Sequence, residues 1–196
     1  MKTLLFLLLA LRLSALEVLT EARVAYFIPT DAQFRSNYGE DGIISSIETS
    51  FHARKDLYPW INISYYGNAA HPSIGGGKKS HIYYIPIGAG LKYLHFFDHL
   101  GFYAGVGVLP AYVHIQNNSP DLFRTQKNWG CGGVGKIGFI ADRLWNCFLD
   151  LFAEYSYIKI PFQNNPKNTL HPANLTNFSI GGAIGYHFGA RRDDDS

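Results

Sequence analysis

The sequence predicts an all-β protein, an eight-stranded antiparallel up-and-down transmembrane β-barrel that follows an N-terminal signal peptide. Three observations predict this fold class. Apolar residues alternate with small or polar ones along eight stretches of the chain, and the connections between these stretches are alternately long and short. Charged residues make up only 16% of a chain that contains 13 Tyr and 14 Phe, a composition that favours strands over helices.

The first 22 residues have the character of a secretory signal peptide. Lys2 precedes an apolar run from Leu4 to Leu11, which is too short to span a bilayer as a helix. The sequence is compatible with cleavage after Ala15 or after Ala22, and an apolar terminal helix retained in the fold is the alternative. No later stretch approaches the roughly 18 consecutive apolar residues of a transmembrane helix.

Residues 22–188 contain eight stretches with the period of a β-strand, separated by turn-forming or polar segments. The expected strands are 22–28, 43–53, 57–66, 81–94, 100–115, 129–141, 145–158 and 177–188. Because this range accounts for all the strands, we expect it to form a single barrel domain. The charged tail 189–196 would then lie in the periplasm.

The connections between the expected strands are long and short in strict alternation. In an up-and-down barrel this places every long connection at one end and every tight turn at the other, as in outer-membrane barrels. Ten residues of about 3.3 Å each, tilted by about 45°, cover roughly 23 Å, close to the apolar band of roughly 25 Å that such barrels present. The pattern therefore predicts an outer-membrane location with four long external loops.

The last expected strand indicates which of its faces meets lipid. Along residues 178–188 the large apolar side chains fall on one face, and small or polar side chains fall on the other. A soluble barrel or sandwich would bury the apolar face and expose a richly charged one, whereas here the polar face carries few charges among Gly and Ser. That face suits the narrow lumen of an eight-stranded barrel, which is just wide enough for side chains to fill.

Six charged residues are predicted to face the lumen: Arg23, Glu48, Lys92, Lys136, Asp150 and Glu154. Unpaired charges in a cramped lumen are costly, so we expect the three cations and three anions to pair. A hairpin that turns about Arg143 would place Lys136 opposite Asp150. A paired polar plug is the structural interpretation of these residues, and an ion-conducting path or a catalytic carboxylate is the functional alternative.

These features together resemble the small eight-stranded outer-membrane β-barrels of the OmpA, OmpX and OmpW kind, over the chain from about Ala22 to Phe188. The last strand of that family is an assembly signal with a polar residue, a Gly and two aromatic residues at alternate positions. Tyr186 and Phe188 fill the aromatic positions, whereas Ala183 stands where Gly is usual and Gly181 where a polar residue is usual. The resemblance implies a monomer whose partners are outer-membrane lipid and the barrel-assembly machinery.

Aromatic residues recur near the ends of the expected strands, as in the interfacial girdle of a membrane barrel. The candidates are Tyr26, Phe27, Trp60, Tyr65, Tyr66, Tyr93, Phe96, Phe97, Trp129, Trp145, Tyr186 and Phe188. Cys131 and Cys147 would lie roughly 25 Å apart along the barrel, far beyond the reach of a disulfide, so we expect two free thiols.

The remaining motifs favour structural roles. The glycine run 130–138 resembles phosphate-binding and dinucleotide-binding loops, but such loops need a helix after them, and here the run continues as a strand. Glycine within a strand instead favours close packing against an aromatic side chain, for which Tyr103 and Tyr155 are candidates. The net charge of +2 does not indicate nucleic-acid binding. Ser80 beside His81 is the one hint of hydrolase chemistry, and adjacent strand residues point to opposite faces. We therefore expect no enzyme activity, cofactor or metal site.

The function that the sequence favours is a structural or surface-interaction role, in which the four long loops contact host or surface ligands. The Gly-, Pro- and Asn-rich composition of these loops suits variable contact surfaces better than a rigid catalytic site. One alternative is a narrow passage for a small hydrophobic or ionic solute. Another alternative, from a different class, is a secreted soluble barrel that binds a hydrophobic ligand as lipocalins do.

Overall fold

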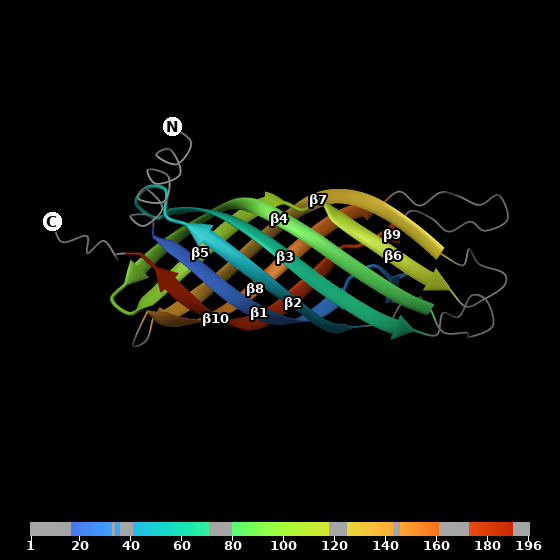
Figure 1. The fold of residues 1–196 in the computed structure, drawn as a ribbon, viewed down its shortest axis with the longest axis horizontal. Helices are drawn as coiled ribbons and strands as arrows, with labels where there is room; N and C mark the ends of the chain where they lie inside the picture. Colours follow the sequence, from blue (N-terminus) through green and yellow to red (C-terminus); the bar gives the residue numbers. More distant parts are fainter. Residues whose placement is uncertain are drawn as a thin grey trace, which may run out of the picture.

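Antiparallel strands account for most of the described chain, and they close into a barrel (Figure 1). The structure is a computed structural model, and it describes residues 17–32, 34–35, 41–70, 80–117, 125–142, 146–160 and 173–189. The strands are β1 (Val18–Pro29), β2 (Gly42–Phe51), β3 (Leu57–Ala70), β4 (Ser80–Phe97), β5 (Leu100–Val108), β6 (Ala111–Asn117), β7 (Thr125–Asp142), β8 (Cys147–Ile160), β9 (Ala173–Asn174) and β10 (Asn177–Phe188). No helix within these ranges is long and apolar enough to cross a membrane.

The barrel wall has eight crossings, because β5 and β6 together form one of them. Both strands pair with β4 and with β7, and the register is the same on either side of the break. The break falls at Leu109–Pro110, where proline has no amide hydrogen to donate. β9 is a two-residue extension beside β8, and β1 closes the barrel by pairing with both β2 and β10. The predicted eight-stranded antiparallel barrel is confirmed.

The stagger between the strands sets the tilt of the barrel. A path from each residue to its paired neighbour leaves β1 at Leu19 and returns to β1 at Pro29, ten residues further along. The path runs through Ser50, Trp60, Gly90, Gly107, Val134, Ser156 and Asn177. With eight crossings and ordinary strand spacings, this stagger corresponds to a tilt of about 40°, in a barrel whose interior side chains can fill.

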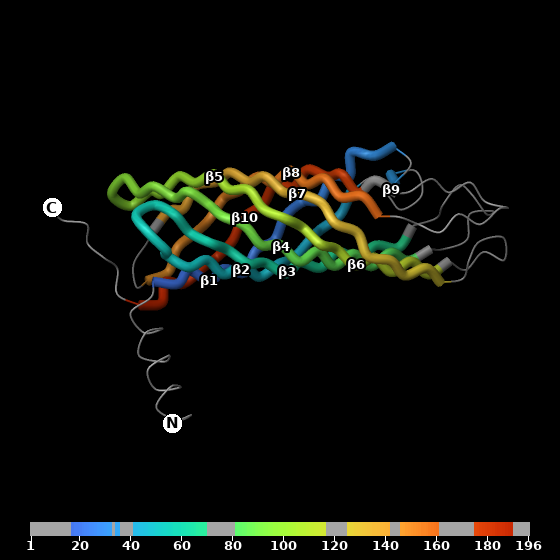
Figure 2. Tube along the Cα trace, turned by 90° about the horizontal axis from the view of Figure 1, so that it is seen from above, coloured from blue at the N-terminus to red at the C-terminus, as the bar shows by residue number. Residues whose placement is uncertain are grey.

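The strand ends joined by short turns and those joined by long connections lie at opposite ends of the barrel, as the sequence predicts (Figure 2). Only Asp98 and His99 separate β4 from β5, and Asp98 has a φ of 53°, a conformation that Asp and Asn adopt more readily than most residues. Asn146, before β8, has a φ of 61°. The long connections fall mainly in 36–40, 71–79, 118–124 and 161–172, which lie outside the described residues.

The strands extend further than the sequence pattern indicates. β1 begins at Val18, although the barrel was expected to begin at residue 22, and β4 and β7 have 18 residues each. β3, β4, β6 and β7 project at the loop end (Figure 1). The hydrophobic alternation does not predict these projecting strand ends, because polar residues such as those of 125–128 take the place of alternating apolar and small residues.

Apolar clusters occupy both ends of the barrel interior. The cluster toward the loops includes Phe27, Tyr66 and Tyr84, and the cluster toward the turns includes Leu19 and Phe148. The expectation that the inner face holds mainly small or polar residues is therefore wrong at the two ends of the lumen. Charged residues lie between the clusters along β1, β7 and β8, and they form the polar middle of the interior.

Candidate functional site

Glu48 on β2 is the centre of an ion network in the barrel interior. Its Oε2 lies 2.7 Å from Arg23 Nη1 on β1, and its Oε1 lies 2.5 Å from Lys136 Nζ on β7 and 3.3 Å from Lys92 Nζ on β4. None of these four residues is more than 3% exposed. The strand alternation turns all four side chains inward, so residues from four strands meet around one carboxylate.

Glu21 joins the same network, although it is not among the six residues that the sequence pattern predicts to face the lumen. Its Oε1 lies 3.3 Å from Lys92 Nζ, and its Oε2 lies 3.9 Å from Arg23 Nε. Glu21 was missed because the expected barrel began at residue 22. The signal was present in the chain, because residues two apart on a strand share a face and Arg23 was already assigned to the lumen.

The register between β7 and β8 differs from the expected one. Lys136 is paired with Glu154, and Asp150 is paired with Ile140. The expectation that Lys136 lies opposite Asp150 is therefore wrong by four residues. The centre of the hairpin lies two residues later than Arg143, which is itself outside the described residues.

The two acidic residues of β8 have separate partners. Glu154, which is 22% exposed, lies 2.9 Å from Arg23 Nη1, whereas Asp150 accepts a 2.9 Å hydrogen bond from the Tyr103 hydroxyl. The described lumen thus holds three cations and four carboxyl groups, counting Glu21. The network is compact, but its acids outnumber its bases by one.

Aromatic rings cover the cations of the network. Lys136 Nζ lies 3.4 Å from the centroid of the Trp60 ring, and the Arg23 guanidinium lies 3.7 Å from that of Phe152. Gly88 and Gly107 make room for Trp60, because a Cβ at Gly88 would lie 2.8 Å from this ring and one at Gly107 would lie 2.6 Å from it. The glycines of the inner face therefore let a large ring extend across the lumen.

The lumen is closed at the level of the network. A path wide enough for water beside Arg23, Lys92 or Lys136 would expose these side chains, and they are almost fully buried. The apolar clusters on either side fill the interior further. The arrangement can hold strands together by charge pairing, and it leaves no solvent path along these described side chains.

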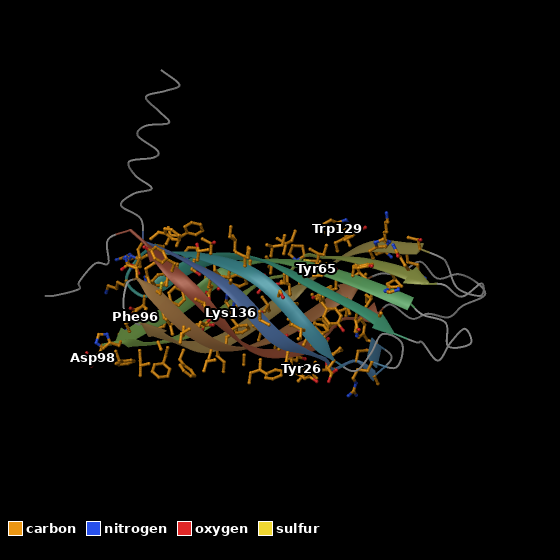
Figure 3. The ribbon with its side chains drawn as sticks, turned by 60° about the horizontal axis from the view of Figure 1, so that its bottom comes forward. Tyr26, Tyr65, Phe96, Asp98, Trp129 and Lys136 are labelled. Carbon is orange, nitrogen blue, oxygen red and sulfur yellow. The ribbon has the colours of Figure 1, made fainter. Side chains whose placement is uncertain are left out.

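Large apolar side chains cover the outside of the barrel. Of the described residues, 28 such side chains are exposed, among them Val24, Ile47 and Leu151. Tyr26, Tyr65 and Trp129 belong to this outward-facing set, whereas Lys136 is buried in the interior (Figure 3). This surface is the inverse of that of a soluble protein, and it is the surface that a barrel presents to lipid.

The fold is that of the small outer-membrane barrels. OprG from Pseudomonas aeruginosa is similar over 90% of this chain and 98% of its own, with a TM-score of 0.67 and 14% identity. Neisserial surface protein A (NspA) is similar over 87% of this chain and 96% of its own (TM-score 0.57, 18% identity), and Ail from Yersinia pestis over 88% and 99% (TM-score 0.55, 10% identity). No protein-family model and no curated protein sequence matches the chain.

The expected aromatic girdle is only partly correct. Phe27, Trp60 and Tyr66 are buried in the lumen, because they lie on the inner parity of their strands. The outward-facing members are Tyr26, Tyr65, Tyr93, Phe97, Trp129, Tyr186 and Phe188. Phe96 is partly buried against the cluster at the turn end, and Trp145 lies outside the described residues. Proximity to a strand end could not separate the two groups, but parity along each strand does.

The cysteines and the glycine run occupy the positions that a strand assignment predicts. Cys131 and Cys147 are both free and exposed, as expected. The glycine run lies within β7, and a Cβ at Gly138 would lie 2.6 Å from the Tyr103 hydroxyl oxygen. The close packing of glycine against Tyr103 is thus confirmed, and the run does not form a strand–turn–helix loop.

Glu17 joins three segments at the turn end of the barrel. Its carboxylate lies 3.8 Å from His52 Nδ1 and 3.6 Å from His187 Nδ1, and it accepts a 3.4 Å hydrogen bond from the Tyr58 hydroxyl. Burial acts to raise the pKa of the Glu17 carboxyl, but the hydrogen bond to His187 and the charge of His52 outweigh it, so this pKa lies below its ordinary value. These contacts tie the start of β1 to the first turn and to the last strand.

The two residues of the expected assembly signal lie side by side on the outer face of β10. Tyr186 and Phe188 are exposed, and their ring centroids are 4.7 Å apart in an edge-to-face arrangement. Their role in assembly stays a prediction. Gly189 follows them with a φ of 93°, and the rest of the charged tail lies outside the described residues.

Proposed function

We propose that the protein is a non-enzymatic outer-membrane barrel whose function is surface interaction through its external loops. The closed lumen is the observation that carries this proposal. The ion network and the two apolar clusters fill the interior. Contacts with external ligands are therefore expected at the loop end of the barrel. The projecting strands β3, β4, β6 and β7 support the same view, because they extend the described barrel wall beyond the other strands at the loop end.

Loop replacement tests this proposal. The segments 36–40, 71–79, 118–124 and 161–172 would each be replaced by a short Gly-Ser linker, and cells that carry each variant would be measured for binding to immobilised extracellular proteins and to sulfated saccharides. Ail was crystallised with the heparin analogue sucrose octasulfate, which provides one concrete probe. We expect at least one replacement to abolish binding, while the variant barrel still shows heat-modifiable migration on a gel. Undiminished binding by every loop variant would contradict the proposal.

The alternative of a narrow passage makes a different prediction. Purified protein in a planar bilayer would show steady conductance that changes in Lys136→Ala and Glu154→Ala if the lumen carried ions. We expect no conductance from the unchanged protein, because Arg23, Lys92 and Lys136, the three cations of the network, are almost fully buried. The lipocalin-like alternative is disfavoured by the exposed apolar belt, which would make a soluble monomer aggregate.

A further inference from the structure

A patch of cationic and aromatic side chains lies on the outer face of the projecting strands. The strand pairing places Tyr83, His114 and Lys127 in one row across β4, β6 and β7, and it places Tyr112 opposite Trp129 in the next row toward the membrane. The rings of Tyr83 and His114 are 5.8 Å apart, and those of Tyr112 and Trp129 are 5.3 Å apart. The register therefore builds one continuous surface from three strands.

Lys159 extends this surface onto β8. It is exposed, and it is paired in register with Cys131, two residues along β7 from Trp129. Its Nζ lies 5.6 Å from the centroid of the Tyr157 ring. We refer to Tyr83, Tyr112, His114, Lys127, Trp129 and Lys159 together as the cationic patch.

The height of the patch matches the headgroups of a bilayer. Phe139 and Trp129 both face outward on β7, ten residues apart, which corresponds to roughly 25 Å of height for a strand tilted by about 40°. Trp129, which is 60% exposed, lies on the outer surface toward the loop end (Figure 3), and an apolar band that begins at Phe139 would end at it. Trp and Tyr prefer that boundary, and Lys127 lies one step beyond it toward the loops.

The described residues around the patch include no carboxylate that could balance its lysines. Neither Lys127 nor Lys159 forms a salt bridge with a described residue, and no acidic residue occurs in 80–85, 111–117, 125–131 or 157–160. On the opposite side of the barrel, in contrast, the Tyr26 hydroxyl donates to the carboxylate of Asp41. Among the described residues, the two lysines of the patch therefore have no counter-charge on their own face.

We propose that the cationic patch binds the phosphate groups of a lipid in the outer leaflet. Lysine ammonium groups attract phosphate, the aromatic rings lie against the upper part of the acyl region, and the His114 ring can add a hydrogen bond. The site is separate from the loops, so it does not depend on the surface-interaction role proposed above.

Lipid retention by the purified full chain tests the proposal. Protein in detergent micelles would be mixed with diphosphorylated lipid A or with its dephosphorylated form, and bound lipid would be counted by native mass spectrometry. The variant K127Q/K159Q removes the two lysine charges of the patch. The control variant R54Q/K55Q removes two exposed charges at the opposite end of the barrel, in the turn before β3.

We expect the phosphorylated lipid to bind the unchanged protein and the control equally, and its affinity for K127Q/K159Q to fall about 20- to 30-fold. The dephosphorylated lipid should bind all three proteins weakly. An equal loss of affinity in both variants, no loss in K127Q/K159Q, or equal retention of the two lipids would overturn the proposal. It would also be overturned if soluble heparin displaced the bound lipid A while added phosphorylated lipid did not. If the double variant fails to show heat-modifiable migration, the single variants K127Q and K159Q each should lose about fivefold.

Discussion

At the scale of single residues, Glu48 has the greatest influence on the barrel interior. It contacts three buried cations from three other strands, and it is the one salt-bridge partner of Lys136 among the described residues. Breaking a buried ion pair from one side is costly because it leaves an uncompensated charge, even where the pair itself contributes little net stability. The network should therefore respond unequally to the loss of its different acids.

We expect Glu48→Gln to destabilise the folded barrel by about 3–5 kcal/mol, because it leaves Arg23, Lys92 and Lys136 short of one carboxylate. Glu154→Gln should cost clearly less, because Glu154 is partly exposed and has one cationic partner. The loss of stability in each variant is measured by urea titration of the protein in detergent, with heat-modifiable migration on a gel as the readout. Equal midpoints for the two variants would show that Glu48 is not the centre of the network.

Two glycines of β7 provide a matched pair for testing the packing of the inner face. A Cβ at Gly138 would lie 2.6 Å from both the Leu151 carbonyl oxygen and the Tyr103 hydroxyl, whereas one at Gly135 would meet nothing within 4 Å. Gly138→Ala should therefore destabilise the barrel by about 1–3 kcal/mol, and Gly135→Ala should leave it nearly unchanged. The same urea titration measures this difference, and a reversed order would contradict the assigned inner and outer faces of β7.

At the scale of elements, β1 restricts where a signal peptide can be removed. Cleavage after Ala22 would remove Val18–Ala22, which pair with both β2 and β10. This segment includes Glu21, a member of the ion network. We therefore expect processing after Ala15, so that the mature chain begins at Leu16. Intact-mass measurement of protein isolated from the outer membrane tests this directly, and a chain that begins at Arg23 would show that the paired start of β1 is dispensable.

The last strand supplies a second test at this scale. Phe188→Ala should lower the amount of barrel assembled in the outer membrane, because Phe188 is the final aromatic of the expected assembly signal. Phe178→Ala is the control, because Phe178 is on the same face of the same strand at its other end. Removal of residues 190–196 should leave assembly intact. Membrane fractionation quantifies all three variants, and equal yields from the two Phe variants would argue against a signal centred on Phe188.

The sequence was sufficient for the strands but not for the contacts between them. Alternation along residues 177–188 predicted the inner and outer faces of β10 correctly, because a period of two depends only on local order. The pairing of Lys136 with Glu154 depends on where the β7–β8 turn is centred, and two residues of error there displaced the pairing by four. Glu21 was missed for a similar reason, because a boundary set at residue 22 excluded it.

At the scale of the whole molecule, the turn end is closed by residues from distant parts of the chain. Glu17, His52 and His187 lie before β1, after β2 and in β10, and their contacts hold the first and last strands against the first turn. The backbone carbonyl of Glu17 also accepts a 2.9 Å hydrogen bond from the amide of His52. This closure includes a titratable carboxylate outside the membrane-spanning strands, so it should depend on pH.

The pKa of Glu17 is lower in the folded barrel than in the unfolded chain. Its contribution is therefore complete above the unfolded pKa of about 4.3, and it is lost as the pH falls through the lower folded pKa. We expect Glu17→Gln to reduce stability at neutral pH and to weaken the loss of stability on acidification. Urea midpoints measured from neutral to acidic pH test this, and parallel pH curves for the two proteins would contradict it.

The distribution of the buried charges also constrains the order of events during membrane insertion. Arg23 and Glu48 belong to the same hairpin, but Lys92 and Lys136 lie on β4 and β7 and reach Glu48 only when the sheet has curved enough to bring these strands across the lumen from β2. A sheet of β3 to β7 inserted alone, before β8 brings Asp150 and Glu154, would carry both ammonium groups into hydrocarbon without a counter-charge, and that is costly. Insertion and closure are therefore coupled, and partly inserted forms should return to the aqueous phase rather than accumulate in the membrane.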